Sequence, residues 1–181
     1  MSRAVFLDRD GVLNRIVWRH GKAASPRTLG ELTIEPEAPA ALAALKAAGF
    51  KLFVVTNQPD VRRGLMAKSA LDAINLALRE ALQVDDVAVC EHDNADDCAC
   101  RKPRPGMLLD LARRHDLDLS ASIMVGDQDR DIACGHAAGC ATVLLARPYN
   151  SGAGADHVVE SLSQALSVIM NAAPTPTPAR L

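Results

Sequence analysis

Aromatic side chains are scarce in this sequence of 181 residues, which has three Phe, one Trp and one Tyr. Proteins that bind single-stranded nucleic acid stack bases on aromatic rings, and few rings are available here. An excess of positive charge is also missing, because 20 Lys and Arg stand against 22 Asp and Glu. Binding to a polyanion over a whole face needs such an excess. We therefore expect no nucleic-acid partner.

Long apolar runs are absent as well. A membrane-spanning helix needs about 18 or more consecutive apolar residues, and no such stretch occurs. The first residues, MSRAVFLDRDG, lack the layout of a signal peptide. The sequence therefore predicts no membrane partner and a cytoplasmic location. Thiols stay reduced in that compartment, so clustered cysteines there indicate metal ligands before disulfides.

Composition and length indicate one globular domain. Hydrophobic residues make up 49% of the chain and charged residues 23%, a balance typical of a packed core. We expect a single domain over residues 1–172. Pro and Thr dominate residues 173–181, for which we predict a flexible tail. No coiled-coil pattern is present, and a monomer is expected.

Short apolar runs alternate with helical patterns along the chain. The predicted strands span residues 3–7, 51–56, 85–90, 121–127 and 140–146, and the predicted helices span 39–49, 68–82, 105–115 and 130–139, with a last short strand and helix within 155–170. Residues 15–32 are expected to form a polar, basic loop. Such alternation predicts an α/β fold with a doubly wound, mainly parallel sheet.

Charged and polar side chains follow several of these strands, at the sheet edge where doubly wound proteins gather reactive groups. They are Asp8 and Asp10 after the first strand, Thr56 at the end of the second, Lys102 after the third, and Asp127 and Asp131 after the fourth. Each group alone is typical of a turn or a helix cap. Their repetition in strand after strand instead indicates one site, and carboxylates that converge favour Mg²⁺.

A second cluster consists of Cys90, His92, Cys98 and Cys100. Three thiolates and an imidazole at this spacing can close a tetrahedron around Zn²⁺, with no open position for catalysis. The alternatives are free cysteines in a surface loop or a redox pair, although a redox pair would favour C-x-x-C. Because the loop leads into Arg101 and Lys102, a structural zinc would aim these cations at the carboxylates. Cys134 and Cys140 are expected in the core.

Four segments carry a family resemblance: FLDRDGVLN, VVTNQ, CRKPRPGM and MVGDQDRD. They resemble the motifs of the haloacid dehalogenase (HAD) superfamily of phosphatases, in the branch with heptose bisphosphate and histidinol-phosphate phosphatases. The resemblance covers about residues 3 to 170 and implies a HAD-like Rossmann-type fold. The short spacings from Asp8 to Thr56 and from Thr56 to Lys102 leave no room for a large cap domain, so we expect an open, uncapped site.

The resemblance also implies a mechanism. Asp8 would attack phosphorus to form an aspartyl-phosphate, and Asp10 would act as acid and then as base. Mg²⁺ would be held by Asp8, the backbone carbonyl of Asp10 and Asp127. Thr56 and Lys102 would hold the phosphoryl oxygens.

A small phosphorylated sugar or similar metabolite is the expected substrate. Residues assigned to substrate binding are Asn57, Gln58, Arg63, Arg101 and Gln128. TNQPDVRRG and RKPRPGM resemble the heptose bisphosphate phosphatases, and this resemblance implies removal of the C7 phosphate of D-glycero-D-manno-heptose 1,7-bisphosphate. The short zinc loop resembles histidinol-phosphate phosphatases, and Gln128 stands where heptose enzymes often have Lys.

A non-enzymatic alternative is a receiver-like phospho-acceptor domain. Receivers also combine acidic residues, Thr, Lys and Mg²⁺ on a similar sheet. Their acceptor aspartate follows the third strand, whereas the D-x-D-G motif here follows the first.

Overall fold

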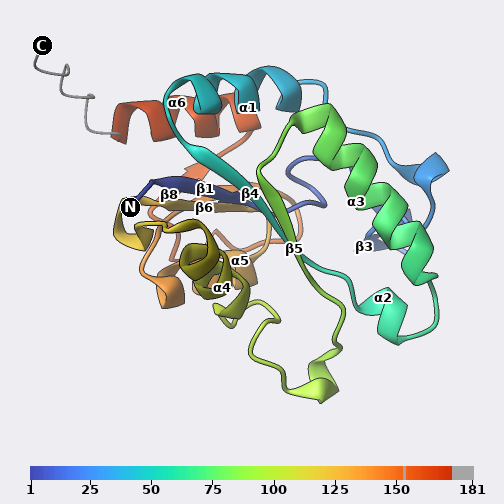
Figure 1. The fold of residues 1–181 in the computed structure, drawn as a ribbon. Helices are drawn as coiled ribbons and strands as arrows, with labels where there is room; N and C mark the ends of the chain where they lie inside the picture. Colours follow the sequence, from blue (N-terminus) through green and yellow to red (C-terminus); the bar gives the residue numbers. More distant parts are fainter. Residues whose placement is uncertain (153, 173–181) are drawn as a thin grey trace, which may run out of the picture.

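Six parallel strands form the centre of the molecule (Figure 1). The computed structural model describes residues 1–152 and 154–172, so the predicted tail at 173–181 lies outside the described residues. The strands are β1 (Ala4–Leu7), β4 (Lys51–Asn57), β5 (Asp86–Cys90), β6 (Ile123–Gly126), β7 (Ala141–Leu145) and β8 (His157–Val159). Their order across the sheet is β5-β4-β1-β6-β7-β8. The predicted parallel sheet is confirmed.

Helices cover both faces of the sheet (Figure 1). One face carries α1 (Ala38–Ala47), α3 (Lys68–Leu82) and α6 (Leu162–Ala172), and α1 packs against the other two; the opposite face carries α4 (Gly106–His115) and α5 (Asp129–Ala138). No helix of residues 1–152 and 154–172 is long and apolar enough to cross a bilayer.

The central strand shows why the sheet needs both layers. In β1, Val5 and Leu7 join the core under α1 and α6, while Ala4 and Phe6 join the core under α4. All four side chains are completely buried. A strand buried on both faces has a continuous apolar sequence without polar alternation, as the AVFL run has.

The strand order creates a crevice at the carboxyl end of β1. The chain passes from β1 to β4 on one side and returns with β6 on the other side. The chain connections next to β1 therefore run to opposite sides of the sheet. Open α/β sheets bind ligands in the crevice at such a switch point.

The segment expected to be a loop at residues 15–32 contains an antiparallel hairpin, which is a correction. Its strands are β2 (Val17–Arg19) and β3 (Lys22–Ala24). His20 and Gly21 between them both have positive φ, of 50° and 72°. Such a two-residue turn matches the twist of a hairpin. A Gly after His is a weak turn signal. The basic residues around it are typical of a loop, so the sequence did not indicate these short strands.

Short helical turns complete the structure. They are α2 (Pro59–Arg62) and three 3-10 turns, η1 (Leu29–Glu31), η2 (Asn94–Asp96) and η3 (Leu119–Ala121). The hairpin and α2 contribute Ala24 and Pro59 to one hollow beside the carboxyl ends of the strands.

Candidate active site

Lys102 is a buried cation that joins three elements. Its ammonium lies 2.8 Å from Asp8 Oδ1 and 2.8 Å from Asp131 Oδ1. It also donates a hydrogen bond of 2.8 Å to the backbone carbonyl of Val55 in β4. Lys102 is only 2% exposed, so the two ion pairs are shielded from water. The structure thus brings together residues predicted from three separate strand ends.

The buried carboxylates repel one another. Burial raises the pKa of Asp8 to about 6, with Lys102 opposing the shift. Burial and the negative charges of Asp8 and Asp131 raise the pKa of Asp127 to about 8. The site therefore holds more negative charge than Lys102 alone offsets, which is the electrostatic setting of a cation site.

The geometry fits a hard divalent cation. Asp8, Asp127 and Asp131 each offer a carboxylate oxygen, and these oxygens lie within 4.8 Å of one another. Among the described side chains, Asp127 Oδ1 is buried and has no hydrogen-bond partner. Buried oxygens are normally satisfied, so this one has an unused place for a ligand. Oxygen donors of this kind match Mg²⁺.

The carboxylate of Asp10 is occupied differently. It accepts two hydrogen bonds of 3.1 Å from Arg9, one of 2.9 Å from Asn14 and one of 2.7 Å from Gln58. Burial alone would raise the pKa of Asp10, but the Arg9 guanidinium lowers it overall. These donors leave the Asp10 side chain outside the carboxylate cluster. The expected contact of Mg²⁺ with the Asp10 backbone carbonyl stays a prediction.

Arg9, which was assigned no role from the sequence, holds the Asp10 carboxylate. It is completely buried, forks onto Asp10 and donates a 2.8 Å hydrogen bond to Asn75 in α3. A bidentate guanidinium fixes both the position and the plane of a carboxylate. An Arg between two Asp in D-R-D-G was the available signal. Its partner, 66 positions along the chain, could not be inferred.

Gln58 was predicted to bind substrate, and its position fits another role better. Its side chain is completely buried and donates to Asp10 Oδ2 and to Thr56 Oγ1, at 2.7 and 2.9 Å. It is not among the residues that line the cavity over the carboxylates. That cavity is lined by Asp8, Asp10, Ile16, Ala23, Ala24, Ser25, Thr56, Asn57, Lys102, Asp127, Gln128 and Arg130.

A second, strongly basic hollow adjoins this cavity and shares five lining residues with it, Ala23, Ala24, Ser25, Asn57 and Arg130. The Lys and Arg residues in its wall are Arg19, Lys22, Arg27, Arg63, Arg101 and Arg130. Several are paired, since Arg63 contacts Asp93 and Arg27 contacts Asp60. Within the described residues, Lys22 and Arg130 make no ion pair or side-chain hydrogen bond, so their charges face the hollow or solvent.

The four zinc-ligand candidates converge. Cys90 Sγ lies 3.6 Å from His92 Nδ1, 3.7 Å from Cys98 Sγ and 3.3 Å from Cys100 Sγ. Cys100 Sγ lies 3.4 Å from Cys98 Sγ and 3.3 Å from His92 Nδ1. Tetrahedral zinc with thiolates at about 2.3 Å separates neighbouring ligands by about 3.8 Å. The donor set and spacing therefore fit Zn²⁺, while a disulfide would need about 2.05 Å.

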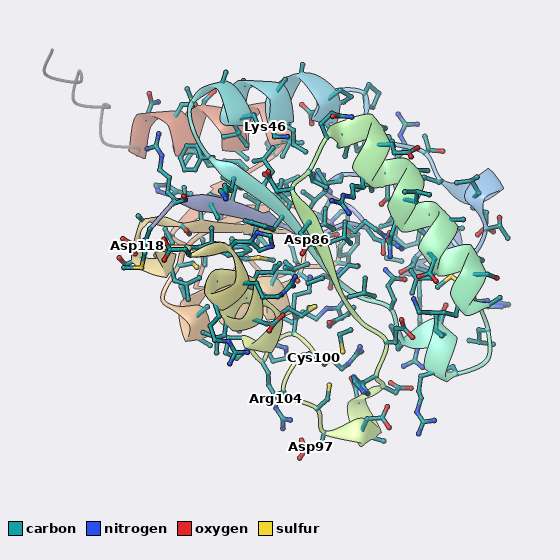
Figure 2. All side chains as sticks on the ribbon, viewed as in Figure 1. Lys46, Asp86, Asp97, Cys100, Arg104 and Asp118 are labelled. Carbon is teal, nitrogen blue, oxygen red and sulfur yellow. The ribbon has the colours of Figure 1, made fainter. Side chains whose placement is uncertain are left out.

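The zinc-loop candidate, residues 90–100, begins at Cys90, the last residue of β5, and extends beyond the sheet to Asp97, as Figure 2 shows. Beyond it the chain returns to Lys102, whose backbone is held by Asn57. Asn57 donates to the Lys102 carbonyl at 3.1 Å and accepts from the Lys102 amide at 3.2 Å. Arg101 instead donates to Asn94 and to the carbonyl of His92, which ties it to the loop.

Two further sequence predictions concern individual positions. Gln128 lines the cavity, at the N-terminus of α5. Cys134 and Cys140 are buried in the core under α4, as predicted.

Comparisons with known proteins agree with this geometry. The HAD-hydrolase-like family model matches residues 99–165. The chain is 38% identical over 148 residues to a D-glycero-beta-D-manno-heptose-1,7-bisphosphate 7-phosphatase of Bordetella bronchiseptica, with 79% of this chain and 80% of the relative covered. It is 37% identical over 169 residues to the corresponding alpha-anomer enzyme of Mycobacterium bovis, with 87% and 86% covered.

Solved structures give the same picture. A crystal structure of D,D-heptose 1,7-bisphosphate phosphatase from B. bronchiseptica with magnesium and phosphate superposes with a TM-score of 0.78 and 33% identity, covering 93% of this chain and 98% of that one. A HAD-like phosphatase from Mesorhizobium loti has a TM-score of 0.78 and 31% identity, covering 97% and 90%.

Proposed function

The chain belongs to the HAD-like phosphatases, in the family of the heptose 1,7-bisphosphate 7-phosphatases, and we propose that it removes the C7 phosphate of D-glycero-D-manno-heptose 1,7-bisphosphate in a Mg²⁺-dependent reaction. The observation that carries the proposal is the contact of the Lys102 ammonium with Asp8, beside the unsatisfied Asp127 oxygen. The side chains proposed as nucleophile, phosphate-binding cation and metal ligand, Asp8, Lys102 and Asp127, line one cavity.

The first half-reaction forms a covalent intermediate. The Asp8 carboxylate attacks phosphorus, the bond from phosphorus to the sugar oxygen breaks, and Asp10 in its protonated form gives its proton to that oxygen. Bound Mg²⁺, held by Asp8, Asp127 and the Asp10 carbonyl, would supply positive charge that offsets the repulsion between carboxylate and phosphate. Lys102 and Thr56 bind the phosphoryl oxygens, whose charge shifts during transfer.

The second half-reaction restores the enzyme. Asp10 takes a proton from water, water attacks the phosphorus of the aspartyl-phosphate, and phosphate leaves with the Asp8 carboxylate regenerated. The Arg9 guanidinium lowers the pKa of Asp10, which favours the ionised carboxylate that takes the proton from water in this half-reaction.

The basic hollow supports a substrate with a second phosphate. Arg130 and Asn57 belong to both cavities, so a sugar held between them would place one phosphate on Asp8 and another among the cations. Arg side chains match phosphate oxygens in pairs. A monophosphate with an imidazole, such as histidinol phosphate, would leave Lys22 and Arg130 of this hollow without a phosphate to bind.

Steady-state assays of phosphate release test the proposal. The substrates are the α and β anomers of heptose 1,7-bisphosphate, histidinol phosphate and an aryl phosphate, each with Mg²⁺ and with EDTA. We expect the highest kcat/KM for one heptose bisphosphate anomer and loss of turnover with EDTA. Faster turnover of histidinol phosphate would reject the substrate assignment. A single phosphoryl uptake without turnover would favour the receiver-like alternative.

A further inference from the structure

The single Tyr and the single Trp of the chain lie against each other near the candidate cation site. The rings of Trp18 and Tyr149 meet edge to face, with centroids 6.4 Å apart and planes at 68°. Trp18 belongs to the β2–β3 hairpin and Tyr149 follows β7. The contact therefore joins two parts of the chain that neither the sheet nor the helices connect.

Tyr149 also contacts Asp127. Its hydroxyl donates a short hydrogen bond to Asp127 Oδ2, while Oδ1 of the same carboxylate is buried without a partner. The adjacent Asn150 donates 2.8 Å hydrogen bonds to the carbonyls of Asp127 and Leu145. The side chain and the main chain of Asp127 are thus both held by the segment after β7. One carboxylate oxygen is fixed and the other stays available to a cation.

Gly11 shows how tightly this arrangement is enclosed. A Cβ atom added to Gly11 would lie 2.0 Å from Asp127 Oδ2 and 3.0 Å from the Tyr149 hydroxyl oxygen. Gly11 also has φ of +86°, which other residues rarely adopt. The loop after Asp10 therefore leaves no space for a side chain beside the carboxylate oxygen that Tyr149 holds.

The hairpin on the other side of Trp18 forms part of the active-site wall. Trp18 pairs with Ala23 in the ladder, and Ala23 and Ala24 line the cavity over the carboxylates. Trp18 is 60% exposed, so little packing besides Tyr149 restrains its ring. Asp127, Tyr149, Trp18 and Ala23 form a continuous series of contacts from the candidate cation site to the cavity wall.

We propose that Tyr149 is a positioning residue that orients Asp127 toward the cation, and that through Trp18 it couples occupation of the cation site to the position of the β2–β3 hairpin. The inference rests on the proposed function for the identity of the cation. Hydrogen bonds to a metal-binding carboxylate orient it and tune its affinity. A cation on Asp127 Oδ1 changes the charge that the phenol faces, and the shift reaches the hairpin through the ring contact.

The test uses Trp18 as the only tryptophan. Mg²⁺ is titrated into the metal-free wild-type protein and Tyr149→Phe without substrate, with Trp emission and calorimetry as readouts. Tyr149→Phe keeps the ring and removes the donor. We expect a saturable emission change in the wild type, about tenfold weaker Mg²⁺ binding in Tyr149→Phe, and a smaller emission change at saturation. Leu76→Ala, at an exposed apolar position on α3, should match the wild type in both readouts.

Two results would overturn the inference. Unchanged Mg²⁺ affinity in Tyr149→Phe would remove the positioning role of Tyr149, and Mg²⁺ binding to the wild type without any emission change would remove the coupling to the hairpin. In either case Mg²⁺ binding and the proposed function would stand. Failure of the wild type to bind Mg²⁺ at all would instead overturn the proposed function together with the inference.

Discussion

At the scale of single residues, the site depends on side chains that never meet solvent. Arg9 is completely buried, but its guanidinium is hydrogen-bonded. Asp10 accepts two hydrogen bonds from it and Asn75 accepts a third. Lys102 is similarly enclosed by Asp8 and Asp131. Charges buried in pairs hold their geometry well, and removal of one member leaves the other uncompensated.

Replacement of Arg9 tests whether the fork positions Asp10. Lys keeps the charge but not the planar pair of donors, so Arg9→Lys should lower kcat about tenfold or more and change KM little. Steady-state kinetics on protein with a measured Tm provide the check. Arg3→Lys, at a side chain that contacts the Ala48 carbonyl away from the site, is the matched control. An unchanged kcat in Arg9→Lys would remove the positioning role.

Three carboxylate variants separate the roles of the aspartates. Asp8→Asn should abolish turnover because the nucleophile is lost. Asp10→Asn should retain Mg²⁺ affinity better than Asp127→Ala, since Asp10 is proposed to bind through its carbonyl and Asp127 through its side chain. Calorimetric titration of Mg²⁺ into each variant gives the affinities. Equal losses in the last two variants would contradict the assignment, and wild-type turnover in Asp8→Asn would contradict the mechanism.

Sequence reasoning located the residues that follow strands, but not the contacts that hold them. Asp8, Asp127 and Lys102 could be placed because parallel strands end at the same sheet edge. The contacts Arg9 to Asn75, Gln58 to Asp10 and Tyr149 to Asp127 join positions 66, 48 and 22 apart. Such contacts arise from packing, which neither motif nor periodicity encodes.

At the scale of elements, long regular segments were predictable and short ones were not. The helix predicted over residues 68–82 is α3 with the same bounds, because its apolar residues recur on one face. The hairpin has strands of three residues each, too short for alternation to appear. It nevertheless contributes Ala23 and Ala24 to the wall of the cavity. The sequence therefore missed part of the cavity wall, while Asp8, Thr56, Lys102 and Asp127 lie at strand ends that it predicted.

The zinc-loop candidate yields a prediction at this scale. The loop at residues 90–100 has little apolar surface, so the metal is expected to hold it and, through it, the approach to Lys102. Cys98→Ser should lower zinc content and activity together, as measured by elemental analysis and phosphate release. Cys140→Ala removes a buried cysteine outside the loop and should keep its zinc. Full activity in zinc-free Cys98→Ser protein would refute the positional role.

Glu37 links two helices that are far apart in sequence. Its carboxylate accepts hydrogen bonds from the backbone amides of Leu162 and Ser163, at 2.9 and 3.1 Å, and from the Ser163 hydroxyl. Burial opposes these bonds, but together they lower the pKa of Glu37 below its ordinary 4.5. The ionised form therefore stabilises the folded state above about pH 4.5, and this contribution is lost as the pH falls through the lowered value.

Urea unfolding at two pH values tests this link. Glu37→Gln should lower the free energy of unfolding by about 1 kcal/mol at pH 7, and the difference from the wild type should shrink near pH 3. Glu80→Gln, on the exposed side of α3, should cause no comparable loss at either pH. A Glu37→Gln effect that is equal at both pH values would show that the charge is not what matters.

At the scale of the whole molecule, the order of the strands explains the site. The switch between β4 and β6 around β1 brings residues 8, 56, 102 and 127 to one cavity without any large insertion. The alternation of elements was enough to predict this sheet. The basic hollow could not be predicted from the sequence. Its wall consists of residues from the hairpin, α2 and the zinc-loop candidate, whose packing against one another no local pattern indicates.

The central claim is that Asp8 and Asp127 share one divalent cation at the point of phosphoryl transfer. A crystal structure of the protein with Mg²⁺ and beryllium fluoride, which mimics a phosphoryl group on a carboxylate, tests it most directly. The account predicts the fluoride adduct on an Asp8 oxygen, in contact with Lys102, and Mg²⁺ bound by Asp8 and by the free oxygen of Asp127. An adduct on another carboxylate, or Mg²⁺ bound elsewhere with Asp127 uncoordinated, would contradict it.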